Sequence, residues 1–505
     1  MTIVSACRKA SSLRTGAIKV AICLLSTSTF TGCVVGPDYQ QPALTMPATW
    51  DGQKAAKPAG PAQLSKWWER LRDPELNALV EEAVAGNLDV ATGKARVREA
   101  RASYRQSAGT LFPSVDGSAS VTRTKANAIS SAGTTSDAYS QYQSGFDASW
   151  ELDLFGANRK AVEVARYGVD AAQEELRSTL LTLVGDVVSN YAQARGYQAR
   201  VALARRSAAS EKETAELTRA VAAAGTATAA DVAKATGQAS STEAAIPTLE
   251  ASYAEAVHRL SVLTGRPPAA LDERLKRGAP IPAPRLPIPA GIPADILLAR
   301  PDVRMAERQY AQYTAKIGQA EAARYPSVSL TGNISTTAYK LGDIGKNSTV
   351  GWSFGPTLSV PLFDAGQLKA AIDVAKAQRD QYFVAYQASV LSALENVENA
   401  LVSLAQERIR SGKLAASAKA YSEAAGLERT LYKGGETNLL DVLDAERSAY
   451  SAEDTLLQSR VLIATDYIAL NKALGGGWDG TIDSAKPEIV DFKQGPRLAA
   501  QAATQ

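Results

Sequence analysis

Four segments of the chain alternate between apolar and polar residues with a period of two. These segments are residues 115–122, 141–154, 328–335 and 350–362. A β-strand places successive side chains on opposite faces, so the alternation predicts four strands, each with one apolar and one polar face. We expect polar loops near 124–139 and 337–349 to join the strands in two pairs.

Two much longer stretches, 157–222 and 365–432, are rich in Ala and charged residues and lack proline, which predicts helix. A helix of about 66 residues would be about 100 Å long. Within the first stretch, apolar residues recur at spacings of three and four, as in a coiled coil. They are Leu176, Leu180, Leu183, Val187, Tyr191 and Ala194. We expect these helices to pack as coiled coils without a globular core.

The chain contains an internal repeat with an offset near 210. Gly225 and the pair Asp231-Val232 match Gly435 and Asp441-Val442 at that offset. Further matches link both the strand segments and the helical segments of the two halves. A proline-rich segment at 266–300 separates the two copies. Proline cannot donate to helix or sheet hydrogen bonds, so we expect this segment to be an extended connector.

The N-terminus reads as an export signal. Residues 1–19 are basic, a short apolar run follows at 20–25, and small residues precede Cys33. The run is too short to span a bilayer, which takes about 20 residues. The pattern resembles a bacterial lipobox, in which the cysteine is acylated, with palmitate as the expected fatty acid; plain signal cleavage is the alternative. Val34 stands where an Asp would retain a lipoprotein in the inner membrane, which favours the outer membrane.

Composition excludes several classes of function. Lys and Arg total 55 against 52 Asp and Glu, and four of the basic residues lie in residues 1–32, which leaves 51 against 52. A near-neutral chain argues against nucleic-acid binding. There is one histidine, His258, and there are three cysteines, so zinc sites, histidine-based triads and disulfide scaffolds are nearly excluded. We expect no enzyme activity, no metal and no cofactor apart from the lipid on Cys33.

Strands of about ten residues with one apolar face are typical of a transmembrane barrel, since a bilayer tolerates no open sheet edge. Four strands cannot close a barrel, so several chains would be needed: two would give eight strands and three would give twelve. Trp150 and Trp352 are candidates for anchors at the membrane interface. The alternative is a soluble four-stranded sheet with its apolar face on a core.

Several motifs occur in a fixed order along the chain. They are Cys33 with Gly36-Pro37-Asp38-Tyr39 and Pro42, Trp67-Trp68 with Asp73-Pro74-Glu75-Leu76, Arg300-Pro301-Asp302-Val303, Tyr432-Lys433-Gly434-Gly435 and Leu443-Asp444-Ala445. This set resembles the NodT-type outer-membrane efflux lipoproteins of the TolC superfamily. The resemblance implies an α+β membrane protein: a homotrimer with one 12-stranded transmembrane β-barrel, four strands per chain, continued by a long periplasmic α-helical coiled-coil tunnel. It also implies a periplasmic adaptor and an inner-membrane transporter, usually of the resistance-nodulation-division class, as partners.

The predicted organisation follows from these patterns. It comprises a lipoprotein signal peptide (1–32), a lipidated segment with the first helices (33–110), barrel strands one and two (111–156), the long helices of repeat one (157–265), the connector (266–300), a helix opening repeat two (301–324), barrel strands three and four (325–363), the long helices of repeat two (364–475) and a loosely ordered tail (476–505).

The turns that end the long helices hold the candidate site. Thr228 and Asn438 each precede an aspartate, Asp231 and Asp441, by three residues, which is the spacing of a capping box. A structural role for these aspartates and a functional one are equally open. In the functional hypothesis, Asp441 and Asp444 share a helix face and three copies form stacked acidic rings that attract cations.

The resemblance favours the functional role of the turns. It implies that Asp441 and Asp444 form periplasmic rings and that Tyr432 and Asp231 hold the closed state. Leu440 is a candidate apolar constriction, with plain helix packing as the alternative. Thr437 replaces an arginine of the archetype, so that salt bridge is not expected.

The sequence thus predicts a passive outer-membrane exit channel for small toxic compounds or drugs, anchored in outer-membrane lipid and extending into the periplasm. Two alternatives stay open: a duct for type I polypeptide secretion, and a structural tether within the envelope.

Overall fold

The computed structural model describes residues 34–43, 65–125, 138–284, 294–478, 482–484, 490–491 and 495–496. The predicted signal peptide and Cys33 lie outside these residues. The chain divides into two compact units. The first comprises residues 1–40, 103–166 and 311–380, and the second comprises residues 41–102, 167–310 and 381–505.

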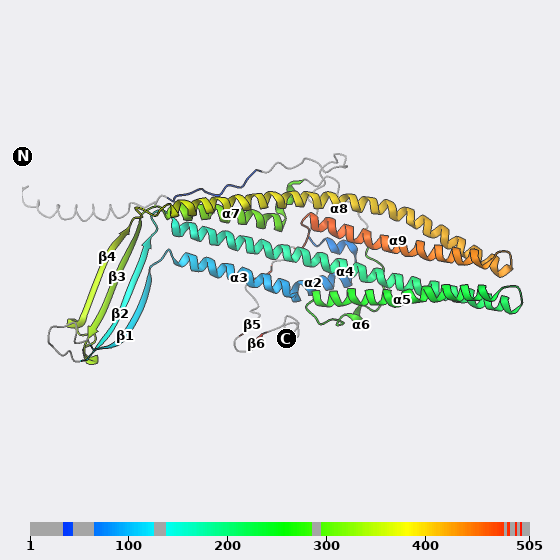
Figure 1. The fold of residues 1–505 in the computed structure, drawn as a ribbon, viewed down its shortest axis with the longest axis horizontal. Coiled ribbons are helices and arrows are strands. Elements are labelled where there is room, and N and C mark those ends of the chain that lie inside the picture. The colour runs from blue at the N-terminus through cyan, green and yellow to red at the C-terminus, as the bar shows by residue number, and fades with distance from the viewer. Residues whose placement is uncertain are drawn as a thin grey trace, which may run out of the picture. The chain divides into compact units, whose positions relative to one another are not determined.

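The first unit contains one antiparallel sheet with the strand order β1-β2-β3-β4 (Figure 1). Its strands are β1 (Ser114–Thr124), β2 (Tyr139–Leu152), β3 (Ser327–Ala338) and β4 (Val350–Ser359). The four strands predicted from the alternation are therefore confirmed. β2 and β4 end two or three residues before the alternating pattern does, and the ladder between β3 and β4 runs from Ser327 to Thr336.

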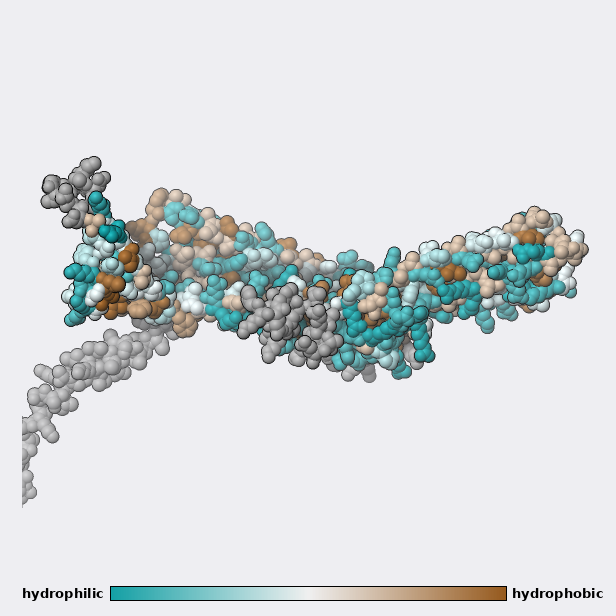
Figure 2. All heavy atoms as spheres, turned by 90° about the horizontal axis from the view of Figure 1, so that it is seen from below, coloured by the Kyte–Doolittle hydropathy of each residue, from teal (hydrophilic) through white to brown (hydrophobic). Residues whose placement is uncertain are grey.

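The strand register places nearly all apolar residues of the sheet on one face. Phe146 pairs with Ile334, and Ile334 pairs with Trp352, so the three side chains lie side by side. The face is exposed: Trp352 is 76% and Phe354 is 69% accessible. Figure 2 shows part of this surface as hydrophobic atoms gathered over the strands. The opposite face carries polar residues, among them Asp116 and its register partner Asp147.

The helices repeat in pairs of matching length, which confirms the two internal repeats. They are α2 (Pro74–Gly86), α3 (Leu88–Gly109), α4 (Ala157–Ala223), α5 (Ala229–Leu263), α6 (Asp272–Leu275), α7 (Pro301–Ala322), α8 (Gln367–Gly434) and α9 (Leu439–Ala473). α4 and α8 have 67 and 68 residues, α5 and α9 have 35 each, and α3 and α7 have 22 each. The short elements are η1 (Trp67–Leu71), η3 (Ala294–Ala299), η4 (Leu341–Asp343), η5 (Asn347–Thr349), β5 (Val490–Asp491) and β6 (Gly495–Pro496).

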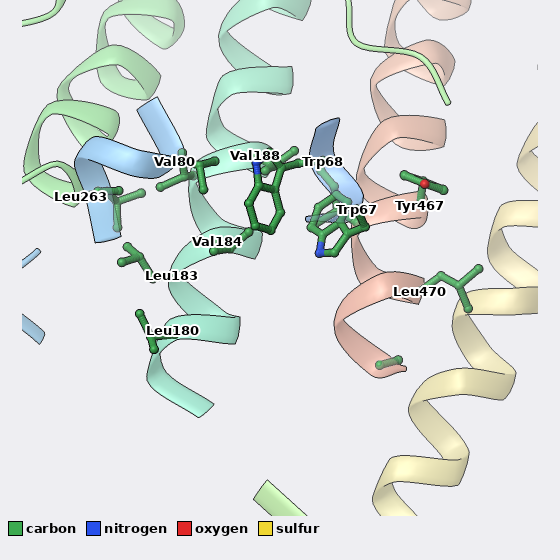
Figure 3. Packing of buried hydrophobic residues seen from close by; sticks show 14 of the residues in the cluster. Trp67, Trp68, Val80, Leu180, Leu183, Val184, Val188, Leu263, Tyr467 and Leu470 are labelled. Carbon is green, nitrogen blue, oxygen red and sulfur yellow. The ribbon is translucent and has the colours of Figure 1, made fainter. Parts of the chain in front are cut away.

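The second unit has a continuous hydrophobic core, and the expectation of helices without one is wrong for this part of α4. The apolar residues from Leu176 to Ala194 belong to one buried cluster with residues of η1, α2, α3, α5, α8 and α9. Figure 3 shows Trp68 beside Val184 and Val188 of α4, and Trp67 near Tyr467 of α9. The residues before the first strand supply the large side chains that close this core. The spacing of the apolar residues along α4 does not by itself show that other segments of the chain pack against them.

Polar contacts and the tail complete this core. Tyr191 donates a 2.6 Å hydrogen bond from its hydroxyl to Asp73, the N-cap of α2. Arg195 donates to the backbone carbonyls of Leu275 and Arg277, which fixes the segment after α5. Trp478 stacks on Trp68 with ring centroids 6.3 Å apart, so the tail begins packed rather than loosely ordered.

No helix in the described ranges combines the length and the apolar character that crossing a bilayer demands.

Candidate functional site

Two helix turns in the second unit hold the predicted site residues. α4 ends at Ala223 and α5 begins at Ala229, while α8 ends at Gly434 and α9 begins at Leu439. Gly225 and Gly435 occupy the left-handed region, with φ of 84° and 76°, where a glycine ends a helix without steric cost. Figure 1 shows both turns at the same end of the four long helices.

The first turn closes with a complete capping box, as the spacing predicted. The amide of Asp231 donates to Thr228 Oγ1 at 3.2 Å, and the amide of Thr228 donates to Asp231 Oδ2 at 3.1 Å. The Thr228 hydroxyl donates to the same carboxylate oxygen at 2.8 Å. These bonds from Thr228 lower the pKa of Asp231 below its usual value.

The second turn is capped by an asparagine. Asn438 Oδ1 accepts from the amide of Asp441 at 3.1 Å, and Asn438 Nδ2 donates to Asp441 Oδ2 at 2.7 Å. Thr437 donates its hydroxyl to the same carboxylate at 3.2 Å. A threonine thus reaches Asp441 where the sequence lacks the archetypal arginine, and the first acid of the pair stabilises the start of α9.

Two further charged residues of the second turn, Asp444 and Lys433, pair within the chain. Asp444 forms an ion pair with Arg447, one helical turn further along α9. Lys433 donates to Glu213 of α4 at 3.0 Å and thereby lowers the pKa of that carboxyl. Asp441 and Asp444 remain exposed, so both are available to other charges in solution.

Besides the pair of Lys433 and Glu213, a small apolar cluster and a hydrogen bond of Tyr432 join the two turns. Ala215, Ala235 and Leu439 are buried together, with Tyr432 and Leu443 packed against them. Thr218 uses its proton on the carbonyl of Thr214 at 2.8 Å, so the Tyr432 hydroxyl, 3.1 Å away, donates to Thr218 Oγ1. Tyr432 therefore holds α8 to α4 directly behind the turns.

A cavity of about 570 Å³ between the turns brings three predicted residues together: Asp231, Tyr432 and Leu440. Leu440 is exposed although its neighbour Leu439 is buried, as a residue not needed for packing within the chain would be. Asp441 and Asp444 do not line this cavity; they follow it along α9.

Sequence reasoning missed a buried polar cluster behind the turns. Glu446 of α9 accepts from Arg429 of α8 at 2.5 Å and lies 3.1 Å from Thr214 Oγ1 of α4. Glu211 of α4 is buried beside it. The sequence does contain a feature that points to this cluster. The charged residues lie on the inward faces of Ala-rich helices, where long polar side chains are unusual.

In the first unit, the segment after the predicted lipid anchor is fixed to the protein. The amide of Val35 donates to the carbonyl of Phe155 at 3.1 Å. The ammonium of Lys160, in the first turn of α4, lies 3.0 Å from Asp38 and 2.9 Å from Glu163. Cys33 itself lies outside the described residues.

The sequence matches the family model for outer membrane efflux proteins over residues 79–266 and 292–476. The two matched segments correspond to the two repeats and cover most of the chain.

This chain belongs to the outer membrane efflux protein family.

Relatives of this outer membrane efflux protein agree with the assignment. The chain is 35% identical over 454 residues to nodulation protein T of Rhizobium leguminosarum bv. trifolii, covering 89% of this chain and 95% of that protein. It is 34% identical to the solvent efflux pump outer membrane protein SrpC of Pseudomonas putida, covering 88% and 96%.

Solved structures extend the likeness to the fold. The outer-membrane channel OprN superposes with a TM-score of 0.81 at 35% identity, covering 88% of this chain and 100% of that chain. The MtrE outer membrane channel of Neisseria gonorrhoeae, solved in an open state, gives a TM-score of 0.79 at 31% identity, covering 88% and 98%. The resemblance read from the motifs is confirmed, and the protein is an outer-membrane efflux channel rather than a member of an enzyme family.

Proposed function

We propose that three copies of this chain form a passive exit channel through the outer membrane, closed at its periplasmic end by the two helix turns. The exposed apolar face of the four-stranded sheet carries this proposal. Exposing such a face to water costs about 25 cal/mol per Å² of apolar area, and placing it against lipid removes this cost. The proposed barrel segments are 111–156 and 325–363, and the proposed tunnel helices are 157–265 and 364–475.

The strand count supports a trimer. Among the described residues, β1 and β4 each pair with a strand on one side, so each leaves one edge of backbone donors and acceptors to satisfy. A bilayer core offers no water for those groups, and single-chain barrels of bacteria begin at eight strands. Joining β4 of one copy to β1 of the next closes twelve strands with three copies.

A stripe on α8 supports the same assembly in the helical part. Val384, Leu391, Val402, Ile409 and Leu427 are all exposed. Their spacings are 7, 11, 7 and 18 residues. A step of 7 or 11 residues rotates a helical position by only about 20°, so the five side chains form one nearly straight line. An apolar line on a long exposed helix fits coiled-coil packing against a second copy.

The remaining parts of the proposal concern the gate, anchor and partners. Three copies of Asp441 and Asp444 would form acidic rings at the periplasmic mouth, with Leu440 as a constriction and with Tyr432 and Asp231 holding the closed state. An acyl group on Cys33 would enter the outer membrane. A periplasmic adaptor and an inner-membrane transporter would supply the energy. The names of relatives support small toxic compounds as cargo, because SrpC is described as a solvent efflux pump component.

Deleting the gene and measuring susceptibility to dyes, detergents, solvents, antibiotics and metal ions tests this function. We expect hypersensitivity that the intact gene rescues. Cys33→Ala, in the same complementation, tests the anchor: a role for the lipid predicts weaker rescue at equal protein level. Unchanged susceptibility together with loss of an exported protein from the medium would replace efflux by polypeptide secretion.

Crosslinking and bilayer recordings test the assembly separately. We expect purified protein to migrate as a trimer and to conduct ions in planar bilayers. A monomer without conductance would favour the envelope tether.

A further inference from the structure

Two buried carboxylates lie behind the helix turns, where α4, α5, α8 and α9 pack together. Glu211 of α4 is 1% exposed and Glu446 of α9 is 5% exposed. Burying an ionised carboxylate without full pairing is costly. Neither the turns nor the rings of the proposed channel explain why two acids occupy this position.

Among the described residues, a cation contacts only one of the two acids, Glu446. Glu446 Oε1 accepts from Arg429 Nε and Nη2 at 3.1 and 2.5 Å, and the Thr214 and Ser210 hydroxyls lie at 3.1 and 3.3 Å. Glu211 Oε1 accepts from neutral Gln238 Nε2 of α5 at 3.2 Å. Within the described part of the chain, the other oxygen of each carboxylate is buried with no hydrogen-bond partner.

The surrounding groups distinguish Glu211, which has no cation in contact among the described residues, from Glu446, which pairs with Arg429. The charged or titratable groups that border the same cavity are Arg206 from α4, Arg429 from α8, and Glu446, Tyr450 and Glu453 from α9; α5 contributes neutral Gln238 and Thr242 to Glu211 itself. Arg206 lies 3.6 Å from Glu453, so it is already engaged. Burial raises the pKa of Glu211, Thr242 and Gln238 oppose this, and the nearby Glu446 raises it further.

A cavity of about 330 Å³ gives the pair access to protons. Its lining includes Glu211, Glu446 and Arg429 together with three serines, Ser207, Ser210 and Ser422. A polar cavity of this size admits water, which can deliver a proton to the buried carboxyl without unfolding the helices.

The cluster is connected to the turns by a short chain of contacts. Glu446 contacts Thr214, whose carbonyl accepts from Thr218, and Thr218 accepts from Tyr432. Arg429 precedes Tyr432 by three residues on α8. A change in the charge of the acid pair therefore acts on the bond that holds α8 to α4.

We propose that Glu211 and Glu446 form a proton-sensitive lock on the helix turns: with Glu211 protonated the four helices stay packed and the turns stay joined, and with Glu211 ionised the repulsion between the two acids loosens them. Glu211 and Glu446 are positioning residues that act through Thr214, Thr218 and Tyr432. This inference rests on the proposed channel function for its physiological meaning, but the lock itself is a property of the fold.

Hydrogen exchange of the turn amides, residues 223–231 and 432–441, measured in purified protein across the pH range and corrected for intrinsic rates, tests the lock. In the wild type we expect the protection of these amides to fall as the pH rises through the pKa of Glu211, by up to about tenfold per pH unit for one coupled proton. Glu211→Gln mimics the protonated acid and should keep the turns protected at every pH. Glu216→Gln, an exposed glutamate five residues along α4, is the matched control and should follow the wild type.

A wild-type profile in Glu211→Gln would overturn the lock. Conductance in planar bilayers, recorded with Asp441→Asn and Asp444→Asn present to remove ring titration, adds the functional readout: open probability should rise with pH and lose that dependence in Glu211→Gln. If the wild type conducts nothing, the channel proposal fails, while the exchange comparison still decides the lock.

Discussion

The turns of the two repeats have the same fold and different charges. At the offset of 210, Asp231 corresponds to Asp441, but Lys234 corresponds to Asp444. Lys234 lies 3.9 Å from Asp231, so the first turn balances its own charge. The second turn carries Glu436 and, at the start of α9, the aspartates Asp441 and Asp444, of which Asp444 pairs with Arg447.

The difference in charge between the two turns separates the residues that cap the helices from those that do not. Both repeats keep a capping residue and an aspartate three positions later, because every helix start needs partners for its free amides. Of the two aspartates that open α9, Asp444 takes no part in the cap within the described part of the chain, and lysine stands at its place in repeat one. Capping therefore does not account for Asp444, and we expect this residue to have a functional role.

The largest expected effect comes from exchanging the two charges. Asp444→Lys combined with Lys234→Asp keeps the net charge of the chain and both caps, yet moves the second acid to the other repeat. If repeat two lines the pore, the double variant should replace three carboxylates at the mouth by three ammonium groups and change the channel from cation-selective to anion-selective. Reversal potentials under a salt gradient measure this, with each single variant as control. An unchanged sign would show that α9 does not face the pore.

Neutralising the acids should have a smaller effect in the same direction. Asp441→Asn with Asp444→Asn keeps the side-chain shape and removes two charges per copy, so cation selectivity should weaken without reversing. Asp231→Asn is the comparison in repeat one and should leave the reversal potential near that of the wild type. Equal shifts from both repeats would contradict the assignment of the pore to repeat two.

Tyr432 has no counterpart in repeat one, where alanine stands at the corresponding position, 222. Tyr432→Phe removes the donor to Thr218 and keeps the ring in its apolar cluster. One such hydrogen bond contributes about 1 kcal/mol, so the equilibrium between joined and separated turns should shift about fivefold toward opening. Open probability in planar bilayers is the measurement. Tyr421→Phe, on an exposed face of α8, should have no effect; equal effects of the two would argue against the Tyr432 bond.

Much of the fold follows from local patterns. Alternation located all four strands, because each strand has a polar face and an apolar face, and the capping spacing located the starts of α5 and α9. The core of the second unit was not predictable in this way. Leu176 and Tyr191 have the spacing of a coiled coil, and only the fold brings Trp67 and Trp68 across to cover them.

For the candidate site too, the local features were predictable from the sequence and the contacts between helices were not. The turns and their aspartates are signalled by glycine, threonine and asparagine at fixed distances along the chain. The pairing of Lys433 with Glu213, and of Glu446 with Arg429 and Thr214, joins residues on different helices. Such contacts depend on the rotation of one helix against another, which the order of residues within either helix does not state.

The smallest expected effect distinguishes the two caps by their response to pH. The pKa of Asp231 is lowered in the folded turn, so its bonds with Thr228 stabilise the turn above the ordinary pKa of an aspartate, about 4, and lose this effect as the pH falls through the lowered value. Thr228→Ala should therefore speed amide exchange in the first turn at neutral pH and less in acid, where only the bond from the Asp231 amide to Thr228 Oγ1 is still there to lose. In the second turn, Asn438 Oδ1 accepts from the amide of Asp441, whose charge does not change, and Asn438 Nδ2 donates to the Asp441 carboxylate. Asn438→Ala should cost about 1 kcal/mol in the second turn, and the part of this cost that comes from the amide bond should remain in acid. Equal pH dependence of the two variants would mean that the carboxylate contributes alike to both caps.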